Sequence, residues 1–131
     1  MTLLDTCVMV FDALAPEQLS KRALAELDKG RESSDLACSG ISLWEIAMLI
    51  SKGRIKTAIP PRNFLADIIA ANRLQVLPIN SEIAFHASFH ADFTHGDPAD
   101  RIIAATALHH KARLLTCDTR LRGMKVLKTV W

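Results

Sequence analysis

The chain has 131 residues, of which 50% are hydrophobic and 23% charged, and its net charge is +2. This composition is typical of a globular domain with a buried core, and five Gly and five Pro leave little room for a disordered region. No apolar run approaches the roughly 20 residues that a membrane helix needs, and no signal peptide is recognisable, so we expect a cytoplasmic protein with no membrane association. The small net charge does not by itself indicate a nucleic-acid partner.

Strand-like and helical segments alternate along the chain, the pattern that favours a parallel α/β sheet. Strands are predicted at 2–5, 36–39, 74–79, 113–116 and 125–130. Pro78 in the third indicates an edge strand or a strand end, and the last is expected at an edge of the sheet. A short helix that includes Val10 and Leu14 is predicted first, followed by a helix that begins at Pro16 and is stopped by Gly30. Further helices are predicted at 42–52 with Gly53 as C-cap, from Pro60-Pro61 onward, at about 81–91 and at 98–110. We therefore predict a single domain over residues 1–131, an α/β/α sandwich with a central parallel sheet of about five strands.

The three cysteines, Cys7, Cys38 and Cys117, do not indicate a disulfide framework. Their number is odd and their spacing is unpaired, which favours a reducing compartment. The chain has no C-x-x-C motif, so we expect no structural zinc site. Each cysteine falls in or just after an apolar strand-like run, where we interpret it as a small buried hydrophobic residue.

Four carboxylates lie at the ends of apolar segments: Asp5, Glu45, Asp100 and Asp118. Asp5 and Asp118 each follow a short strand-like run, and the carboxyl ends of neighbouring parallel strands open into one crevice. Four carboxylates crowded there would repel one another and resist ionisation. A divalent cation relieves that cost, and hard cations such as Mg²⁺ prefer oxygen ligands. The pattern therefore indicates an acidic metal site.

Each acid also has a local interpretation as a helix cap. Asp5 is a good N-cap, and Ser42 with Glu45 reads as a capping box. Asp97 is a good N-cap for a helix with Pro at its first position, which frees Asp100 to point elsewhere. Asp118 reads as a turn or a cap. Taken one at a time, these positions leave both interpretations open; the metal interpretation depends on their convergence.

Beyond these local patterns, the chain resembles the PIN-domain family, and within it the VapC-type ribonuclease toxins of bacterial toxin–antitoxin pairs. The resemblance covers essentially the whole chain, in the order and spacing of its motifs. Its residues are Leu3-Leu4-Asp5-Thr6, Ser42-Leu43-Trp44-Glu45-Ile46-Ala47, His95-Gly96-Asp97-Pro98-Ala99-Asp100-Arg101-Ile102-Ile103-Ala104-Ala105, Leu115-Thr116-Cys117-Asp118 and the final Val130-Trp131. Many relatives carry Asn two residues after the first Asp, where this chain has Cys7.

The resemblance implies a PIN-like, doubly wound parallel sheet and an endoribonuclease that depends on Mg²⁺ or Mn²⁺. It also implies an RNA substrate, a cognate antitoxin and a homodimer. The family's metal-binding acids match Asp5, Glu45, Asp100 and Asp118, position by position. We expect Asp5, Asp100 and Asp118 to hold one cation and Glu45 to bind a second or to orient the attacking water.

Accessory roles are expected for four further residues near these acids. Thr116 is expected to position water or metal, Arg101 to hold an acid or the phosphate backbone, and Asp97 to serve as a lower-ranked acid. His95 is a candidate contact for substrate or partner.

Two other functions compete with the nuclease. In a catalytically inactive PIN-like binding module, the acids only cap helices. A phosphatase or phosphoacceptor domain is less favoured, because a haloacid-dehalogenase-type enzyme would need a second Asp at the position of Cys7.

Overall fold

The structure, a computed structural model, describes residues 1–93 and 96–131, and its centre is a five-stranded sheet in the order β3-β2-β1-β4-β5. Every strand pair is parallel. The strands are β1 (Thr2–Leu4), β2 (Leu36–Ser39), β3 (Gln75–Leu77), β4 (Arg113–Leu115) and β5 (Thr129–Val130). All five predicted strands are therefore confirmed, with β3 and β5 at the edges as expected.

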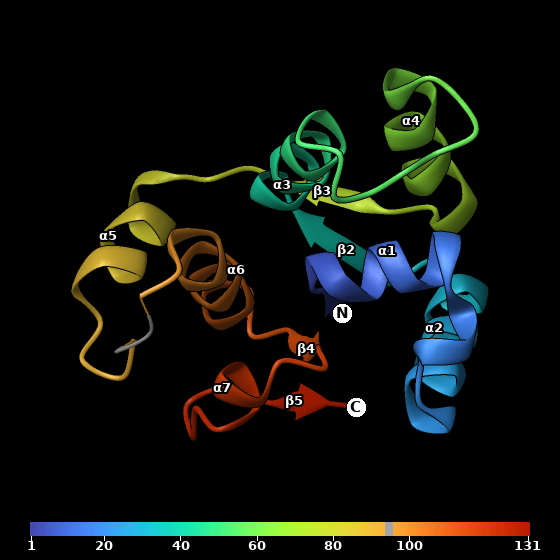
Figure 1. The fold of residues 1–131 in the computed structure, drawn as a ribbon. Coiled ribbons are helices and arrows are strands. Elements are labelled where there is room, and N and C mark those ends of the chain that lie inside the picture. Colours follow the sequence, from blue (N-terminus) through green and yellow to red (C-terminus); the bar gives the residue numbers. More distant parts are fainter. Residues whose placement is uncertain (94–95) are drawn as a thin grey trace.

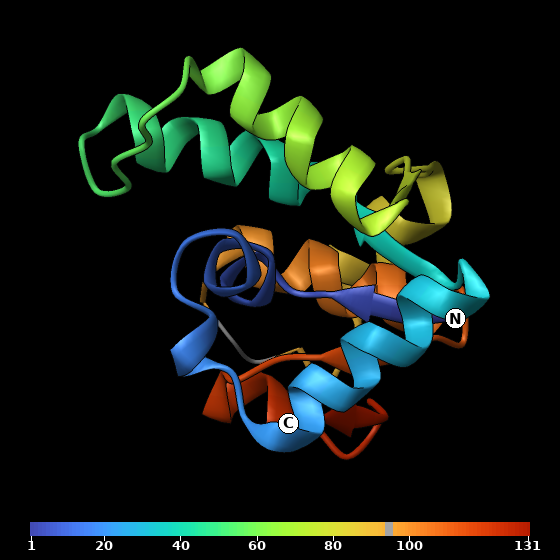
Figure 2. The same ribbon diagram turned by 90° about the vertical axis from the view of Figure 1, so that its right-hand side faces the viewer.

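Helices cover both faces of this sheet, which confirms the α/β/α sandwich (Figure 1). They are α1 (Thr6–Leu14), the 3-10 helix η1 (Pro16–Gln18), α2 (Lys21–Ser33), α3 (Gly40–Ser51), α4 (Pro61–Asn72), α5 (Ser81–Phe89), α6 (Pro98–His109) and α7 (Thr119–Arg122). The helices α1 to α4 pack on one face and α5 to α7 on the other. The α3 and α4 helices run alongside each other at the edge of the molecule (Figure 2). Within the described ranges, no helix has the length and apolarity to cross a bilayer.

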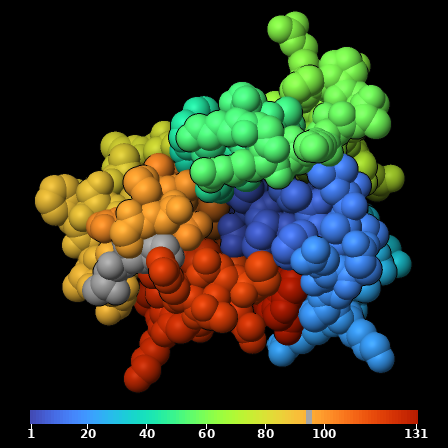
Figure 3. Space-filling model, viewed as in Figure 1, coloured from blue at the N-terminus to red at the C-terminus, as the bar shows by residue number. Residues whose placement is uncertain are grey.

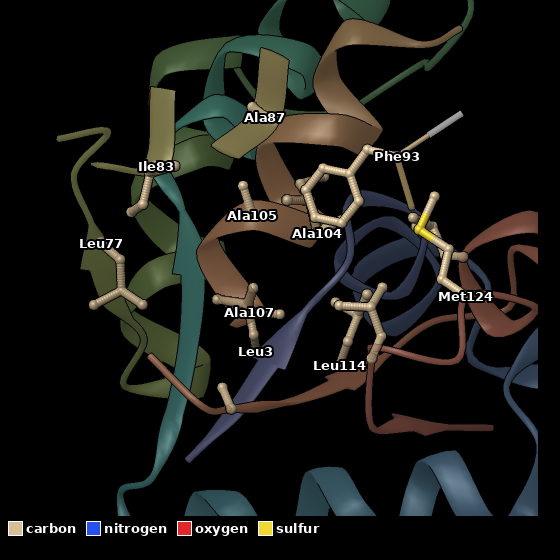
Figure 4. Packing of buried hydrophobic residues seen from close by; sticks show 14 of the residues in the cluster. Leu3, Leu77, Ile83, Ala87, Phe93, Ala104, Ala105, Ala107, Leu114 and Met124 are labelled. Atoms are coloured by element: carbon tan, nitrogen blue, oxygen red, sulfur yellow. The ribbon is translucent and has the colours of Figure 1, made fainter. Parts of the chain in front are cut away.

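Alternation along the strands divides the hydrophobic core into two layers. Successive side chains of a strand point to opposite faces, so Leu3 and Leu114 join the α5–α7 layer, whereas Leu4 and Leu115 join the α1–α4 layer. All four are fully buried. Figure 4 shows the first layer, in which small alanines of α6 let the helix lie close to the sheet. The central strands β1 and β4 are therefore fixed from both sides.

The strand order creates a switch point beside β1. From β1 the chain winds outward through β2 to β3, then returns to add β4 and β5 on the other side of β1. Connections that leave β1 and β4 in opposite directions open a crevice outside their carboxyl ends, where open α/β sheets bind ligands. The register places Leu4 beside Leu115, so the next residues, Asp5 and Thr116, meet at this crevice.

Two predicted helix boundaries were wrong. Pro16 begins only a turn of 3-10 helix, and α2 starts after Ser20, whose hydroxyl accepts a hydrogen bond from Ala23 N at 2.9 Å. Gly30 does not stop α2, which continues to Ser33. A Cβ at Gly30 would lie 2.1 Å from a methyl carbon of Leu36, so this glycine allows α2 to pack closely against β2.

Candidate active site

Asp5 lies at the carboxyl end of β1 and begins α1. Its backbone N–H donates to the Leu115 carbonyl at 3.0 Å, which extends the pairing of β1 with β4 by one residue. Its Oδ1 accepts the Thr6 N–H at 2.7 Å, so the predicted N-cap is confirmed. The residue is only 4% exposed. Asp5 therefore caps α1 and is also a buried acid at the switch point.

Thr116 connects the two acids that follow β1 and β4. Its Oγ1 donates to Asp5 Oδ2 at 2.6 Å and accepts the Asp118 N–H at 3.0 Å. Asp118 in turn caps α7, because its Oδ1 accepts the Arg120 N–H at 2.8 Å and the Leu121 N–H at 3.0 Å. Thr116 is fully buried. Its hydroxyl thus fixes the Asp5 carboxylate relative to the Asp118 backbone.

Glu45 lies within α3 (Gly40–Ser51), not at the start of that helix. The N-cap is Ser39, whose Oγ accepts the Ile41 N–H at 3.4 Å, and the helix begins at Gly40. The capping box of Ser42 with Glu45 is therefore wrong, and Ser42 Oγ is buried with no hydrogen-bond partner in the part of the chain that the structure describes. Because Glu45 lies in the second turn of α3, it is not needed as a cap.

The fourth acid comes from α6. Asp97 is the N-cap, as predicted, and its Oδ1 accepts the N–H groups of Ala99 at 2.9 Å and Asp100 at 3.2 Å. Asp100 lies in the first turn and lines the cleft described below. The Arg101 guanidinium donates to the carbonyls of Ala87 at 2.6 Å and Ser88 at 3.0 Å, in the last turn of α5. The candidate His95 lies outside the described residues.

A cleft of about 360 Å³ collects all four carboxylates. Figure 3 shows this face, with the start of α1 in dark blue between α6, α7 and the end of α3. The cleft is also lined by residues one helical turn or more beyond the acids of α1 and α3. These are Val10, Phe11, Leu49, Arg54 and Ile55. The cleft therefore has an acidic part and an apolar part, and the apolar part also contains the guanidinium group of Arg54.

Burial and mutual repulsion raise the pKa values of three of these acids. Burial is the largest cause for Asp5, and the Asp118 charge adds to it, although the hydrogen bonds from Thr116, Cys7 and Thr6 oppose the shift. Burial also raises the pKa of Glu45, the nearby Thr6 hydroxyl opposes the shift, and the charges of Asp97 and Asp5 add to it.

At Asp100, burial and then the charges of Asp97, Asp5, Asp118 and Glu45 raise the pKa to about 7. This carboxyl therefore keeps its proton to a higher pH than an ordinary aspartate does. A cation in the cleft would favour the charged forms and so oppose all three shifts.

The residues fit a hard divalent cation by their chemistry. The cleft offers carboxylate oxygens and the buried Thr6 Oγ1, which lies close enough to Glu45 to lower its pKa and has no other hydrogen-bond partner among residues 1–93 and 96–131. Oxygen donors of this kind are the ligands of Mg²⁺ and Mn²⁺. In the described residues, no three acidic, histidine or cysteine side chains form a ready-made metal site. Like charges separate when nothing neutralises them, so the side chains would have to close around a cation.

Two cysteines lie in contact beside these acids, which the sequence did not indicate. The Sγ atoms of Cys7 and Cys117 are 3.0 Å apart, and Cys7 Sγ donates to Asp5 Oδ2 at 3.4 Å. Burial, then the Asp5 charge, raises the pKa of Cys7. Cys38 is fully buried in β2, as expected, but Cys7 and Cys117 are half-buried and line the cleft. Their separation by 110 residues hid this contact from sequence reasoning.

Comparisons with known proteins agree with this geometry. The PIN domain family matches residues 2–127. The chain is 35% identical to Ribonuclease VapC22 of Mycobacterium tuberculosis, over 98% of this chain and 97% of the relative.

Solved structures share the fold. The crystal structure of VapBC2 from Rickettsia felis, bound to a DNA fragment from its promoter, matches with a TM-score of 0.75 at 18% identity, over 98% of this chain and 96% of that one. FitAcB from Neisseria gonorrhoeae matches with a TM-score of 0.65 at 26% identity, over 100% and 97% of the two chains. On the match over residues 2–127 and the identity to VapC22, this chain belongs to the PIN domain family.

Proposed function

We propose that this protein is an endoribonuclease toxin that hydrolyses RNA phosphodiester bonds with the help of a divalent cation. The observation that carries the proposal is the convergence of Asp5, Glu45, Asp100 and Asp118 on one cleft at the switch point between β1 and β4. The similarity to Ribonuclease VapC22 supports the same activity.

Asp5, Asp100 and Asp118 are the proposed ligands of one Mg²⁺ or Mn²⁺ ion, and Glu45 binds a second ion or orients the attacking water. When bound, the metal supplies a water of lowered pKa and positive charge beside the phosphate oxygens. The chain's own part is to hold the acids in place. Thr116 fixes one oxygen of Asp5 through its 2.6 Å hydrogen bond, and Asp97 fixes the first turn of α6 that carries Asp100.

The other part of the cleft fits a ribonucleotide next to the cleaved bond. Phe11 offers a ring and Ile55 an apolar side chain to a base, whereas Arg54 offers a cation to a phosphate. None of the ion pairs found within the described ranges involves Arg54. We propose that these residues bind single-stranded RNA beside the acids. Replacement of Arg54 by Met should weaken substrate binding more than it lowers the rate at saturating RNA.

An antitoxin is the proposed protein partner. Solved structures that share the fold include a toxin–antitoxin complex from Klebsiella pneumoniae, with a TM-score of 0.67 at 19% identity. A cleft with several carboxylates accepts an inserted arginine through charge-assisted, bidentate hydrogen bonds. We propose that an arginine of the antitoxin occupies the acidic part of the cleft, in a cytoplasmic complex. Expression of the whole operon should yield the two proteins together, and recovery of this chain alone would count against an antitoxin.

A homodimer is the proposed assembly, through the exposed face of α5. Phe85 and Phe89 stack with ring centroids 5.1 Å apart and are 54% and 73% exposed. Aromatic side chains this exposed commonly mark an interface. Light scattering should report a dimer for the native chain and a monomer for Phe89→Ser, with Leu14→Ser as the control at another exposed apolar position. A native monomer would exclude this assembly.

The first test of the proposed function is cleavage of total cellular RNA by the purified chain, with Mn²⁺ or with EDTA. Asp100→Asn is the matched variant, because it keeps the size and shape of the side chain and removes its negative charge. We expect discrete fragments with the native chain and Mn²⁺, and none with EDTA or with the variant. Fragments of the same yield from Asp100→Asn would show that the assignment of this ligand is wrong.

The inactive binding module remains the second candidate, because Asp5, Asp97 and Asp118 do cap helices. In that case Mn²⁺ would not raise the unfolding temperature of the chain. Thermal unfolding with and without Mn²⁺ therefore separates the two functions without any RNA substrate.

A further inference from the structure

The contact between Cys7 and Cys117 has no role in the proposed hydrolysis. Each thiol follows one of the two central strands, Cys7 in the first turn of α1 and Cys117 just after β4. The paired β1 and β4 fix their positions, because Leu4 lies in register with Leu115 and the Asp5 N–H binds the Leu115 carbonyl. The contact thus depends on the pairing of β1 with β4.

The two sulfur atoms are already close to bonding distance. They are 3.0 Å apart, whereas a disulfide bond is about 2.05 Å long, so an approach of about 1 Å closes the gap. Both cysteines line the cleft and are half-buried, which gives a small oxidant access to them. Cys38 has neither property, because it is fully buried inside β2.

We propose that Cys7 and Cys117 form a redox-active dithiol, a modification site that a peroxide oxidises to a reversible intramolecular disulfide across the floor of the cleft. The reaction consumes one hydrogen peroxide and yields two waters. In the first step one thiol sulfur attacks a peroxide oxygen and the O–O bond breaks. The departing hydroxide takes the thiol proton, and the sulfur becomes a sulfenic acid.

In the second step the other thiol sulfur attacks the sulfenic sulfur. The S–O bond breaks, the hydroxide leaves with the second thiol proton as water, and the S–S bond forms. The two thiols lose two electrons and two protons in total, which the peroxide takes up. A dithiol reductant returns the pair to its starting state by exchange.

Oxidation changes the surroundings of two proposed metal ligands, a consequence that rests on the proposed function. The Cys7 thiol loses the proton that it donates to Asp5 Oδ2. Cys117 precedes Asp118, whose backbone N–H is tied to Thr116, so movement of Cys117 toward Cys7 displaces this loop. We therefore infer that the disulfide lowers the affinity of the cleft for its cation.

The chemical test uses the native chain and three variants, Cys7→Ala, Cys117→Ala and Cys38→Ala. Each is treated with hydrogen peroxide, alkylated in denaturant, and analysed by intact mass and peptide mapping without reduction. We expect the native chain and Cys38→Ala to lose two hydrogens and to yield a peptide that joins Cys7 to Cys117. Dithiothreitol should reverse the loss, and Cys7→Ala and Cys117→Ala should form no such bridge.

Three alkylatable thiols in the oxidised native chain would overturn the proposal, as would a bridge that includes Cys38 or joins two chains. This result needs no variant to fold and no nuclease activity. The second measurement is the rise in unfolding temperature caused by Mn²⁺, which should be smaller for the oxidised chain than for the reduced one.

An equal rise in both states would overturn the effect on cation binding. No rise in either state would instead reject the proposed metal site and leave the mass result to decide the disulfide.

Discussion

The surroundings of Asp12 and the cleft around Asp5 each hold a largely buried aspartate, and the two negative charges are balanced in different ways. Where α1, α2 and α4 meet, Asp12 of α1 is 14% exposed and pairs with Arg31 of α2 at 2.5 Å. Asn72 of α4 donates a hydrogen bond to the other carboxylate oxygen at 3.1 Å. In the cleft, Asp5 is 4% exposed, and its side-chain partners are a threonine hydroxyl, a cysteine thiol and a backbone N–H.

The difference shows what each region is built for. An arginine placed beside Asp12 completes the charge balance within the fold, and the pair is a structural feature. The ion pairs of the described ranges include none with Asp5, Glu45 or Asp118, so these three carboxylates have no arginine partner of the kind that Asp12 has. We therefore expect a bound ligand to supply compensating positive charge. A divalent cation and an inserted arginine both meet this requirement.

The largest expected effect comes from Asp5→Asn set beside Asp12→Asn. Loss of a group that only orients a metal ligand costs about 10- to 100-fold, and a ligand itself should matter more, so Asp5→Asn should reduce cleavage by more than about 100-fold. It should also abolish the stabilisation by Mn²⁺. Asp12→Asn should retain cleavage and lower the free energy of unfolding, because it breaks a partly buried ion pair. Cleavage assays and urea unfolding of both variants check this prediction. Equal cleavage by the two variants would show that Asp5 has no greater role in the reaction than Asp12.

Removal of the arginine tests the other region. Arg31→Met keeps most of the apolar stem of the side chain but leaves Asp12 buried without a cation, and should lower the free energy of unfolding by about 2 kcal/mol. This loss is smaller than for a fully buried pair, because Arg31 is 32% exposed. Urea unfolding at pH 7 measures the change, with Arg62→Met, on the exposed side of α4, as the control. If Arg31→Met lowers the free energy of unfolding no more than the control does, the pair of Arg31 with Asp12 does not contribute to stability.

Replacement of Asp100 should raise the free energy of unfolding at high pH, whereas replacement of Arg31 should lower it. Between the ordinary pKa of 3.8 and the raised value of about 7, the folded state holds a proton that the unfolded state has lost. The contribution of this group to stability is therefore complete below 3.8 and lost as the pH rises through about 7. Asp100→Asn should stabilise the metal-free chain by about 1 kcal/mol at pH 8, after a discount for partial exposure, and change it little at pH 5.

Urea unfolding in EDTA at the two pH values measures this prediction. A side chain that only supports the first turn of α6 would behave differently, since its replacement should cost stability at pH 8. A destabilised Asp100→Asn variant would therefore contradict the repulsion inferred for the cleft.

The smallest change in stability is expected for Glu45→Gln. Because α3 begins at Gly40 with Ser39 as its cap, the Glu45 carboxylate is not needed at the helix start, and the free energy of unfolding should change by less than about 0.5 kcal/mol. The affinity for Mn²⁺ should nevertheless fall by about tenfold. Titration of Mn²⁺ against unfolding temperature measures both quantities, and an unchanged affinity would remove Glu45 from the site.

Local sequence patterns determined most of the elements. The caps at Asp5 and Asp97, the edge strands and the helix that begins at Pro61 were predictable, because capping and hydrophobic periodicity act over a few residues. The errors at Gly30 and Ser42 have a tertiary cause. Gly30 serves the approach of α2 to Leu36, and α3 starts earlier than the capping motif suggested, at the end of β2.

The sequence by itself determined which acids stand at the ends of strands and helices, since that depends on neighbours in the chain. Only the tertiary structure decided that these acids share a cleft, that Thr116 joins Asp5 to Asp118, and that Cys7 touches Cys117. Those contacts follow from the strand order, which places β4 beside β1 although more than a hundred residues separate them. Pairing over such distances is set by the packing of the whole chain and leaves no local pattern to find.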